Sequence, residues 1–431
     1  MCAQPNFSFS HFLILSISNF LIFSFSTFLI LPASAQTSDA LIRQQLEDYG
    51  VRFTDDNNVR LLKSGQAKFD AMFEDIRQAR QSIHLEYFNF RNDSIASLLF
   101  DILRQKRQEG VEVRAMFDGF GNDSNNQPLK KYHLKALRDD SISIYEFDPI
   151  RFPWVNHIWP RDHRKIVVID GHIAYTGGMN VADYYIKGTE QVGEWRDMHC
   201  RIEGSAVNDL QHIFCRIWLE VTGENLTDSR YYRGTASGNM PVGIINREPG
   251  TVRSESGRLL GKNDIVRRFY VWAIDDARDS LRIINPYFTL VPSIKKAIER
   301  AIDRGVQVDI MVSATSDIPL TPDCVYYNVH KLMKRGARVW LYKPGFHHSK
   351  IMMVDGRFCT VGSSNLDARS CRFDYEENAV ILDRSVTREL DDMFDRDKQK
   401  SFYLTPETWN EFRTPWQKFR GWFAHLLTPW L

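Results

Sequence analysis

The stretch that decides the fold is His163-Arg-Lys-Ile-Val-Val-Ile-Asp-Gly171, because a second stretch, His348-Ser-Lys-Ile-Met-Met-Val-Asp-Gly356, repeats its pattern. Each copy leads into a glycine-containing corner that ends in an asparagine, Asn180 in the first and Asn365 in the second. The histidine, lysine, aspartate and asparagine of the two copies are all separated by 185 residues. One H-x-K-x4-D sequence is a weak signal, but two copies in register predict two similar halves in one chain.

The same order of predicted elements precedes each copy. Hydrophobic periodicity indicates a helix, a strand, a second helix, a glycine and a second strand, and a third strand follows. The predicted ranges are 67–79, 82–90, 94–108, 111–117 and 142–147 in the first half, and 265–277, 280–288, 292–304, 306–312 and 337–342 in the second. Alternating strands and helices favour an α/β fold of two similar halves, each a mostly parallel sheet flanked by helices.

The spacing inside each copy places two polar side chains together. Residues i and i+2 of an extended segment point to the same face, so His163 projects with Lys165, and His348 projects with Lys350. The apolar run after each lysine predicts a buried strand. If the two halves face each other, they offer two imidazoles and two ammonium groups, which suit a phosphodiester anion.

The aspartates and asparagines follow these strands. Asp170 and Asp355 each precede a glycine and predict a tight turn, after which a second strand returns to the glycine-containing corner. Asn180 and Asn365 lie where a turn can direct their amides back toward the lysines. We therefore expect the active site at the interface of the two halves.

The composition is that of an ordinary globular protein with balanced charge. The 431 residues include 55 Lys and Arg against 54 Asp and Glu, a formal net charge of +1, and 43% are hydrophobic. This excludes wholesale disorder and argues against a strongly basic nucleic-acid-binding protein. No metal or cofactor is predicted, because the sequence holds no His/Asp/Glu cluster at metal-ligand spacing. The six cysteines lack C-x-x-C spacing and are predicted to be buried thiols.

Both ends of the chain have compositions found at membranes. Residues 1–35 contain no Asp, Glu, Lys or Arg, and Phe12–Leu31 is largely apolar. With Ala33-Ser-Ala35 as a small-x-small cleavage site, this segment is predicted to be an export signal, an uncleaved anchor or an over-extended start. Residues 415–431 are rich in Trp, Phe and Leu, which indicates either a membrane-interfacial helix or a helix docked on the core.

With both motifs described, the sequence resembles the phospholipase D superfamily, and more closely the bacterial cardiolipin synthases. The similarity runs over about residues 61–400 and includes further synthase-like stretches: 84–88 (HLEYF), 195–199 (WRDMH), 285–288 (NPYF), 304–306 (RGV), 344–348 (PGFHH) and 365–370 (NLDARS). The predicted division of the chain is a signal or anchor at 1–35, a lead-in at 36–60, one phospholipase D-like half at 61–222, a linker at 223–240, a second such half at 241–400 and a tail at 401–431.

The resemblance implies a two-step reaction through a phosphohistidine. One histidine attacks phosphorus, and the other protonates the leaving alcohol and then deprotonates the incoming one. We assign His163 as the nucleophile and His348 as the general acid and base, although the symmetric sequence permits the reverse. The non-bridging phosphate oxygens are expected to be held by the other repeated donors, which are Lys165, Asn180, Lys350 and Asn365.

Each histidine also needs a carboxylate that fixes its tautomer and orientation. Glu376 heads a predicted strand in the second half and matches the superfamily's glutamate. Asp197 is its expected counterpart in the first half, with Glu194 as the alternative. Asp170 and Asp355 are candidates either for a direct catalytic part or for turn capping.

The predicted function is cardiolipin synthesis, in which two phosphatidylglycerol molecules give cardiolipin and glycerol at a bacterial cell membrane. A phospholipase D that hydrolyses phospholipids to phosphatidic acid would use the same residues, and a phospholipase D-family nuclease is a third hypothesis. The near-neutral charge favours lipid over nucleic acid. Phosphatidylglycerol and a membrane surface are therefore the expected partners, and the sequence does not indicate an oligomeric state.

Overall fold

The computed structural model describes residues 38–150, 160–253, 259–318 and 321–426. The described residues from Ile42 onward form one compact unit, and the few described residues before it belong to another. The segment predicted as an export signal or anchor, 1–35, lies outside the described residues. Among the residues that are described, no helix combines the length and the apolar character needed to span a membrane.

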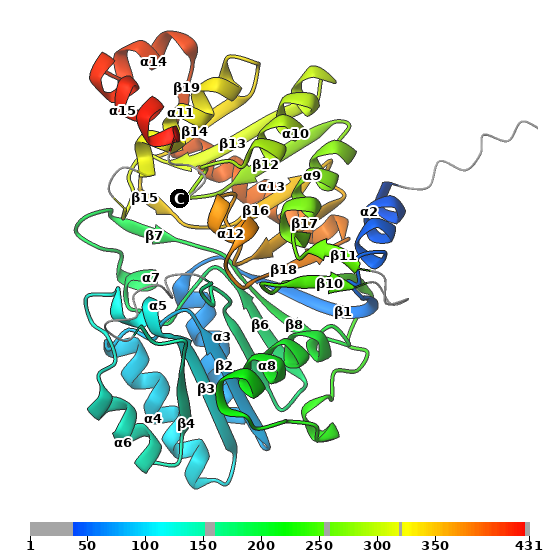
Figure 1. The fold of residues 1–431 in the computed structure, drawn as a ribbon, viewed down its shortest axis with the longest axis vertical. Helices are drawn as coiled ribbons and strands as arrows, with labels where there is room; N and C mark the ends of the chain where they lie inside the picture. The colour runs from blue at the N-terminus through cyan, green and yellow to red at the C-terminus, as the bar shows by residue number, and fades with distance from the viewer. Residues whose placement is uncertain (1–37, 151–159, 254–258, 319–320, 427–431) are drawn as a thin grey trace, which may run out of the picture. The chain divides into compact units, whose positions relative to one another are not determined.

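A single sheet of fifteen strands forms the middle layer of the larger unit (Figure 1). Its strands, in spatial order, are β19 (Ser401–Leu404), β14 (Arg338–Tyr342), β13 (Gln307–Ser313), β12 (Ser280–Ile284), β16 (Ile351–Val354), β17 (Phe358–Gly362), β18 (Glu376–Ile381), β9 (Met240–Arg247), β1 (Phe53–Leu62), β8 (His199–Glu203), β6 (Ile173–Gly177), β5 (Ile166–Ile169), β2 (Ser82–Tyr87), β3 (Glu112–Asp118) and β4 (Ser143–Phe147).

The sheet has a two-fold repeat about its central antiparallel pair, β1 and β9. Going outward from this pair, the strands β8, β6, β5, β2, β3 and β4 on one side correspond to β18, β17, β16, β12, β13 and β14 on the other. The two predicted halves therefore share one continuous sheet. Strand β1 begins inside the predicted lead-in at 36–60, so part of that segment belongs to the centre of the fold.

The mixed α/β class with helices flanking a large sheet is confirmed, but the prediction that each half is mostly parallel is wrong. Parallel pairing in this sheet is confined to β2–β3–β4 and β12–β13–β14. The other neighbouring strands of the sheet pair antiparallel. The reason lies in the connections, since helices cross over between the parallel strands, whereas short turns reverse the chain between β5 and β6 and between β16 and β17.

Helices cover both faces of the sheet because its motif strands are apolar on both sides. Val167 and Ile169 of β5 pack into a cluster with the helices of the first half, whereas Ile166 and Val168 join the cluster on the opposite face. The predicted helices are confirmed within about two residues at each end. The main helices are α3 (Gly65–Gln78), α4 (Ser94–Gln108), α6 (Lys131–Asp139), α8 (Val207–Thr222), α9 (Ile265–Asp276), α10 (Pro292–Asp303), α11 (Thr321–Met333) and α13 (Arg384–Gln399).

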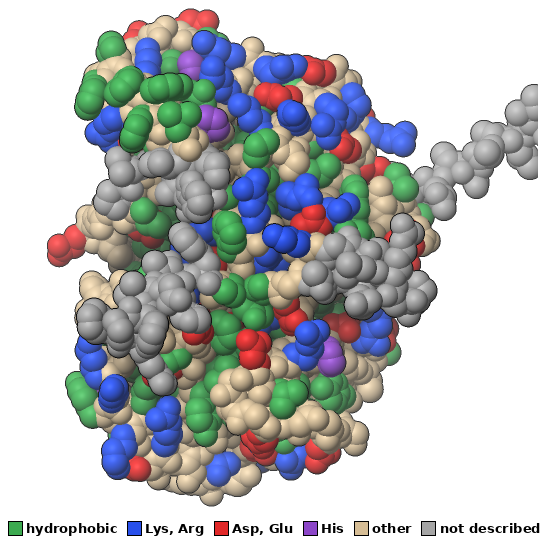
Figure 2. Space-filling view, in the orientation of Figure 1, with side chains coloured by type: hydrophobic (Ala, Val, Ile, Leu, Met, Phe, Trp, Pro, Cys, Tyr) green, Lys and Arg blue, Asp and Glu red, His purple; other side chains and the backbone are tan. Residues whose placement is uncertain are grey.

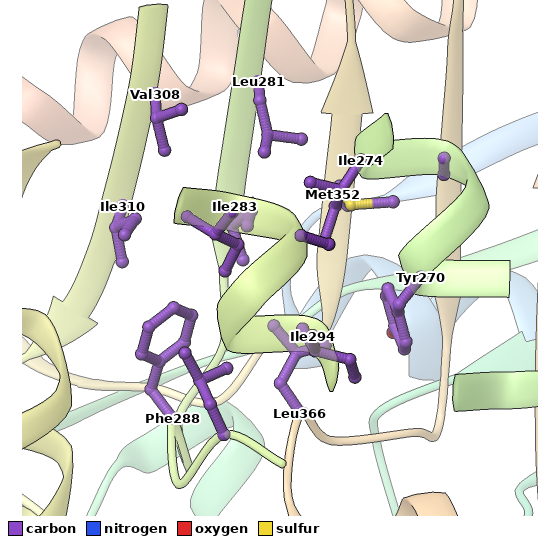
Figure 3. Packing of buried hydrophobic residues seen from close by; sticks show 14 of the residues in the cluster. Tyr270, Ile274, Leu281, Ile283, Phe288, Ile294, Val308, Ile310, Met352 and Leu366 are labelled. Atoms are coloured by element: carbon purple, nitrogen blue, oxygen red, sulfur yellow. The ribbon is translucent and has the colours of Figure 1, made fainter. Parts of the chain in front are cut away.

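The core of the second half shows how these layers hold the motif strands. Figure 3 shows Leu281 and Ile283 of β12 and Met352 of β16 packed against residues of the covering helices, among them Ile274 of α9 and Ile294 of α10. Full burial of one such aliphatic side chain contributes about 1.5–3 kcal/mol. The packed core therefore holds in place the motif residues that lie next to these strands.

Helix α15 (Pro415–Leu426), near the C-terminus, is docked on the core, as one of the two interpretations of its composition predicted. It docks on α11 through its small residues Gly421 and Ala424, which are buried. Arg420 donates from Nε to Asp323 of α11 at 2.9 Å. The other face of α15 is exposed, and Figure 2 shows apolar side chains gathered at the upper left, where Figure 1 draws α15. The large apolar residues of α15 that are exposed are Trp416, Phe419, Trp422, Phe423 and Leu426.

Candidate active site

The two repeated motifs end in corresponding places beside the sheet. His163 and Lys165 lie immediately before β5, and His348 and Lys350 lie immediately before β16. Both strands are fully buried, so the backbone on which these side chains depend is fixed by the core. The two half-sites are therefore positioned in equivalent ways, each directly before a buried strand.

Each histidine is bound by a carboxylate from the opposite half. The Nδ1 atom of His163 lies 3.0 Å from Oε1 of Glu376, and the Nδ1 atom of His348 lies 2.7 Å from Oδ2 of Asp197. A carboxylate only accepts, so Nδ1 carries the proton in both rings and Nε2 keeps a lone pair. Because the pairs cross between the halves, the two motifs form one site.

Short backbone contacts fix these crossed pairs. The amide of His163 donates to the carbonyl of Tyr375 at 3.0 Å, and the amide of His348 donates to the carbonyl of Arg196 at 2.6 Å. In the second case the strand β15 (Gly345–His347) pairs in parallel with β7 (Glu194–Arg196). Each histidine is therefore held beside the residue that immediately precedes its carboxylate partner.

The buried environment keeps both imidazoles neutral. Burial, together with the adjacent lysine, lowers the pKa of His163 and that of His348 to about 4. Burial by itself would raise the pKa of Glu376, but His163 and Lys165 bring it down to about 2. At neutral pH each imidazole therefore has a protonated Nδ1 facing a carboxylate and a lone pair on Nε2, which suits nucleophilic attack or proton acceptance. In His348 this Nε2 lies 3.1 Å from Nζ of Lys350.

The repeated lysines and asparagines surround these rings. The ammonium of Lys350 donates to the carbonyl of His348 at 2.6 Å, and that of Lys165 donates to the carbonyl of His163. Burial lowers the pKa of Lys165, and it lowers that of Lys350 to about 8. Asn180 and Asn365 are each 5% exposed, and their Oδ1 atoms have no hydrogen-bond partner within the described part of the chain. An oxyanion here would be held by the two ammonium groups and by the Nδ2–H groups of the asparagines, because an amide oxygen only accepts.

Asp170 and Asp355 lie at the far ends of β5 and β16 from the lysines, where they fix the backbone. Asp170 accepts hydrogen bonds from the amides of residues 80, 81 and 82 at 2.7–2.9 Å. Asp355 accepts from the amides of residues 278, 279 and 280 at 2.7–3.0 Å. Both have a φ of 52°, in the left-handed region that Asp tolerates in turns. These contacts support the turn-capping interpretation of the two aspartates.

The alternative carboxylate and the remaining histidines have other partners. Glu194 is exposed and accepts a hydrogen bond from the hydroxyl of Tyr342 at 3.2 Å. His84 contacts Gln211, and His347 contacts Asp397 at 3.3 Å, both in buried surroundings. Among the described residues, no group of three or more His, Cys, Asp or Glu side chains is arranged to hold a metal ion.

Several residues that the sequence did not single out support the first half-site. Ser370 donates to Glu376 at 2.5 Å, and Ser363 donates to the same carboxylate. Glu377 accepts from the amide of Lys165 at 3.2 Å and from the hydroxyl of Thr176 at 2.8 Å, and burial raises its pKa to about 7. The two consecutive glutamates at 376–377 could have drawn attention to Glu377, but the sequence alone does not indicate which residues Glu377 contacts.

A lysine and a tyrosine play matching parts beneath the two asparagines. Lys68 of α3 is fully buried and donates to the carbonyls of Met179 and Asn180 at 3.4 and 3.1 Å. Tyr270 of α9 lies 3.3 Å from the carbonyl of Ser364, the residue equivalent to Met179. The first helix of each half therefore fixes the backbone that carries its asparagine, with a different donor in each case.

Comparisons with known proteins agree with this geometry. The family model described as "Cardiolipin synthase, PLD-like domain" matches residues 72–218 and 270–398, once in each half. A cardiolipin synthase of Oceanobacillus iheyensis is 33% identical over 390 residues, covering 90% of this chain and 78% of the relative. Cardiolipin synthase 2 of Staphylococcus epidermidis is 35% identical over 392 residues, with the same coverage. The crystal structure of phosphatidylserine synthase from Haemophilus influenzae has the same fold, with a TM-score of 0.66 at 17% identity over 90% of this chain and 99% of that one.

Proposed function

The chain belongs to the cardiolipin synthase family with phospholipase D-like domains, and from this membership we propose that it is a phosphatidyltransferase that makes cardiolipin. The proposed reaction takes two phosphatidylglycerol molecules to cardiolipin and glycerol. The observation that carries the proposal is the pair of crossed histidine–carboxylate contacts, His163 with Glu376 and His348 with Asp197. These contacts orient two imidazoles in equivalent ways, and a double displacement at phosphorus requires two such groups, one as nucleophile and one as acid and base.

In the first step, Nε2 of His163 attacks the phosphorus of a bound phosphatidylglycerol. The bond from phosphorus to the glycerol oxygen breaks, and His348 delivers a proton from Nε2 to that oxygen. This step needs a protonated His348, and the phosphodiester anion raises the pKa of a nearby imidazole by favouring its charged form. The products are glycerol and a phosphatidyl group on His163.

In the second step, a hydroxyl of another phosphatidylglycerol gives its proton to Nε2 of His348 and attacks phosphorus. The nitrogen–phosphorus bond breaks, which releases cardiolipin and restores both histidines. Lys165, Lys350 and the amides of Asn180 and Asn365 hold the non-bridging oxygens as negative charge grows. Loss of one preorganised donor of this kind costs a factor of about 10²–10³ in rate.

We also propose that the exposed face of α15 rests on the membrane that supplies the lipid. Its Trp, Phe and Leu side chains are the types that bury in the headgroup region. Trp416 is 64% exposed and Phe423 is 55% exposed, which is unusual for such large apolar residues. Burial and the charges of Lys295 and Lys331 lower the pKa of His425 at the end of this helix. Lysines so close to the apolar face would attract anionic lipids.

The test is an incubation of the purified full-length chain with vesicles of phosphatidylglycerol, followed by analysis of lipid and water-soluble products. Cardiolipin with an equal amount of glycerol is expected. Phosphatidic acid as the main product would identify a hydrolase, and absence of both would refute a phospholipid-transferring activity. A parallel incubation with single-stranded DNA, which should stay intact, excludes a nuclease.

A further inference from the structure

One carboxylate near His348 has no part in the proposed chemistry. Asp317 follows strand β13 and is half-buried. Its two oxygens both lie 2.9 Å from the hydroxyl of Tyr287, which donates to them. The Nε2 atom of Gln191, from the first half, lies 3.5 Å from the carbonyl of Asp317. Tyr287 therefore fixes the carboxylate, while Gln191 of the other half contacts the backbone of the same residue.

Asp317 lies on the side of the site that holds His348. The ring of Tyr287 meets the imidazole of His348 edge to face, with centroids 5.8 Å apart and planes at 82°. The negative charge of Asp317 is close enough to act on both His348 and Lys350, where it opposes the lowering of their pKa values by burial. Tyr287 thus links the two groups, with its hydroxyl on Asp317 and its ring against His348.

The corresponding position in the first half is built differently. The residues that end the two equivalent strands, Asp118 of β3 and Ser313 of β13, each accept the amide of the residue before the catalytic histidine, at 2.9 and 2.6 Å. Four residues later the chain reaches Asn122 in one half and Asp317 in the other. Asn122 is buried and bonds to the backbone of Leu129 at 2.8 Å. The half-exposed carboxylate thus occurs on the His348 side, where the repeat is broken.

We infer that Asp317, held by Tyr287, binds the free hydroxyls of a glycerol group and makes the enzyme select polyol alcohols. This inference rests on the proposed function, because it concerns the glycerol that leaves in the first step and the glycerol hydroxyl that attacks in the second. Both occupy the same place beside His348, since the two steps are the reverse of each other at phosphorus. A carboxylate offers about four lone-pair sites, and the phenol of Tyr287 fills one of them.

A competition between two donors tests this selection. Vesicles with equal amounts of phosphatidylglycerol and phosphatidylpropanol, whose alcohol lacks the two extra hydroxyls, are incubated with the full-length chain. The ratio of released glycerol to released propanol gives the ratio of kcat/KM for the two headgroups. A hydrogen bond to a charged group corresponds to about 10–100-fold in this ratio, so Asp317→Ala should lower the wild-type preference for glycerol by that factor.

Matched variants separate selection from general damage. Asp317→Asn keeps the shape, and Tyr287→Phe removes the hydroxyl that fixes the carboxylate, so both should lower the preference less than Asp317→Ala. Asp392→Ala, at an exposed position of α13, should leave it unchanged. If all variants release glycerol and propanol in the wild-type ratio, the inference is wrong while the proposed function stands. If the wild-type chain releases no glycerol, the proposed function fails and the inference fails with it.

Discussion

The half-sites of His163 and His348 share the same histidine–carboxylate contact but differ in the charged residues that surround it. In each, a neutral imidazole donates from Nδ1 to a carboxylate of the other half. Behind His163, the buried Arg164 pairs with Glu86 at 2.7 Å. Behind Asp197, the neighbouring cation is the buried Lys68, whose own pKa is lowered by burial. The repeated backbone frame supplies the geometry twice, while the charges behind it differ, which allows the two histidines to take different parts.

The largest expected effect comes from removing either histidine. His163→Ala and His348→Ala should each lower turnover of phosphatidylglycerol by about 10⁴-fold or more, as for other paired catalytic groups. The comparison becomes sharper with phosphorus-labelled lipid. His348→Ala should form an acid-labile label on the protein only slowly, because the leaving glycerol lacks its acid, whereas His163→Ala should form none. The opposite labelling would exchange the two assignments, and substantial turnover by either variant would remove the two-histidine scheme.

The crossed carboxylates come next. Asp197→Asn and Glu376→Gln keep the shape of each contact but remove the acceptor that fixes the Nδ1 proton, and each should lower kcat by about 10²–10⁴-fold. Glu194→Gln, beside Asp197 in the sequence, is the matched control and should change kcat less than about twofold, within the usual effect of a surface change. A large loss in the Glu194 variant would contradict the observed pairing.

A smaller effect is expected from the two residues beneath the asparagines. Lys68→Met and Tyr270→Phe each remove one buried donor, so we expect kcat to fall by about tenfold with little change in KM. If Lys68 acts through Asn180, the combination of Lys68→Met with Asn180→Ala should be no worse than Asn180→Ala alone. Independent, multiplying losses would show that Lys68 supports the fold and not the amide.

The pH profile of kcat/KM reports the free enzyme. His163 and His348 have pKa values near 4, so they become protonated, and Nε2 loses its lone pair, only below about pH 4. Lys350 has a pKa near 8, so its ammonium is lost above that pH. Because the first step needs neutral His163 and protonated His348, kcat/KM should be highest near pH 4 and fall as the pH rises, with a further alkaline limb above about pH 8. Lys350→Arg should retain its charge and move the alkaline limb upward, and an unmoved limb would assign it to another group.

The smallest catalytic effect is expected at Asp170 and Asp355. Each binds three backbone amides, and leaving such donors unpaired costs about 1–3 kcal/mol of stability. Asp170→Ala and Asp355→Ala should therefore lower the unfolding midpoint, measured by denaturant, while the folded fraction keeps a kcat close to wild type. A loss of kcat above about 10²-fold in the folded fraction would restore their direct catalytic part.

The sequence predicted the features that repeat locally. The motif strands, their turns and the helices before them were readable from periodicity and from the offset between His163 and His348. The central strand β1 was missed because its sequence, FTDDNNVRLL, is polar on the side that alternates out of the core. A half-buried antiparallel strand of this kind has too few apolar residues to stand out from a lead-in.

The partners across the interface could not be predicted. Asp197 and Glu376 were found as carboxylates at strand starts, but each contacts the histidine of the other half, which depends on how the halves meet. Lys68 was equally hidden, because an isolated lysine in an amphipathic helix is usually at the surface. Its burial follows from aromatic neighbours, with Nζ 4.4 Å from the ring centroid of Phe69 and 4.8 Å from that of Tyr87.

The central pair β1–β9 joins the two halves through their backbones as well as through the site. The sheet is continuous from β4 to β19, with one shift of register between Thr54 and Asn57 of β1. In the proposed reaction, glycerol leaves and the second lipid enters while the phosphatidyl group stays on His163. The cycle of this proposed reaction would thus begin with the escape of glycerol and continue with the entry of the bulkier phosphatidylglycerol. After glycerol has left, either water or the second lipid can enter, and their relative rates of entry would decide between hydrolysis and transfer.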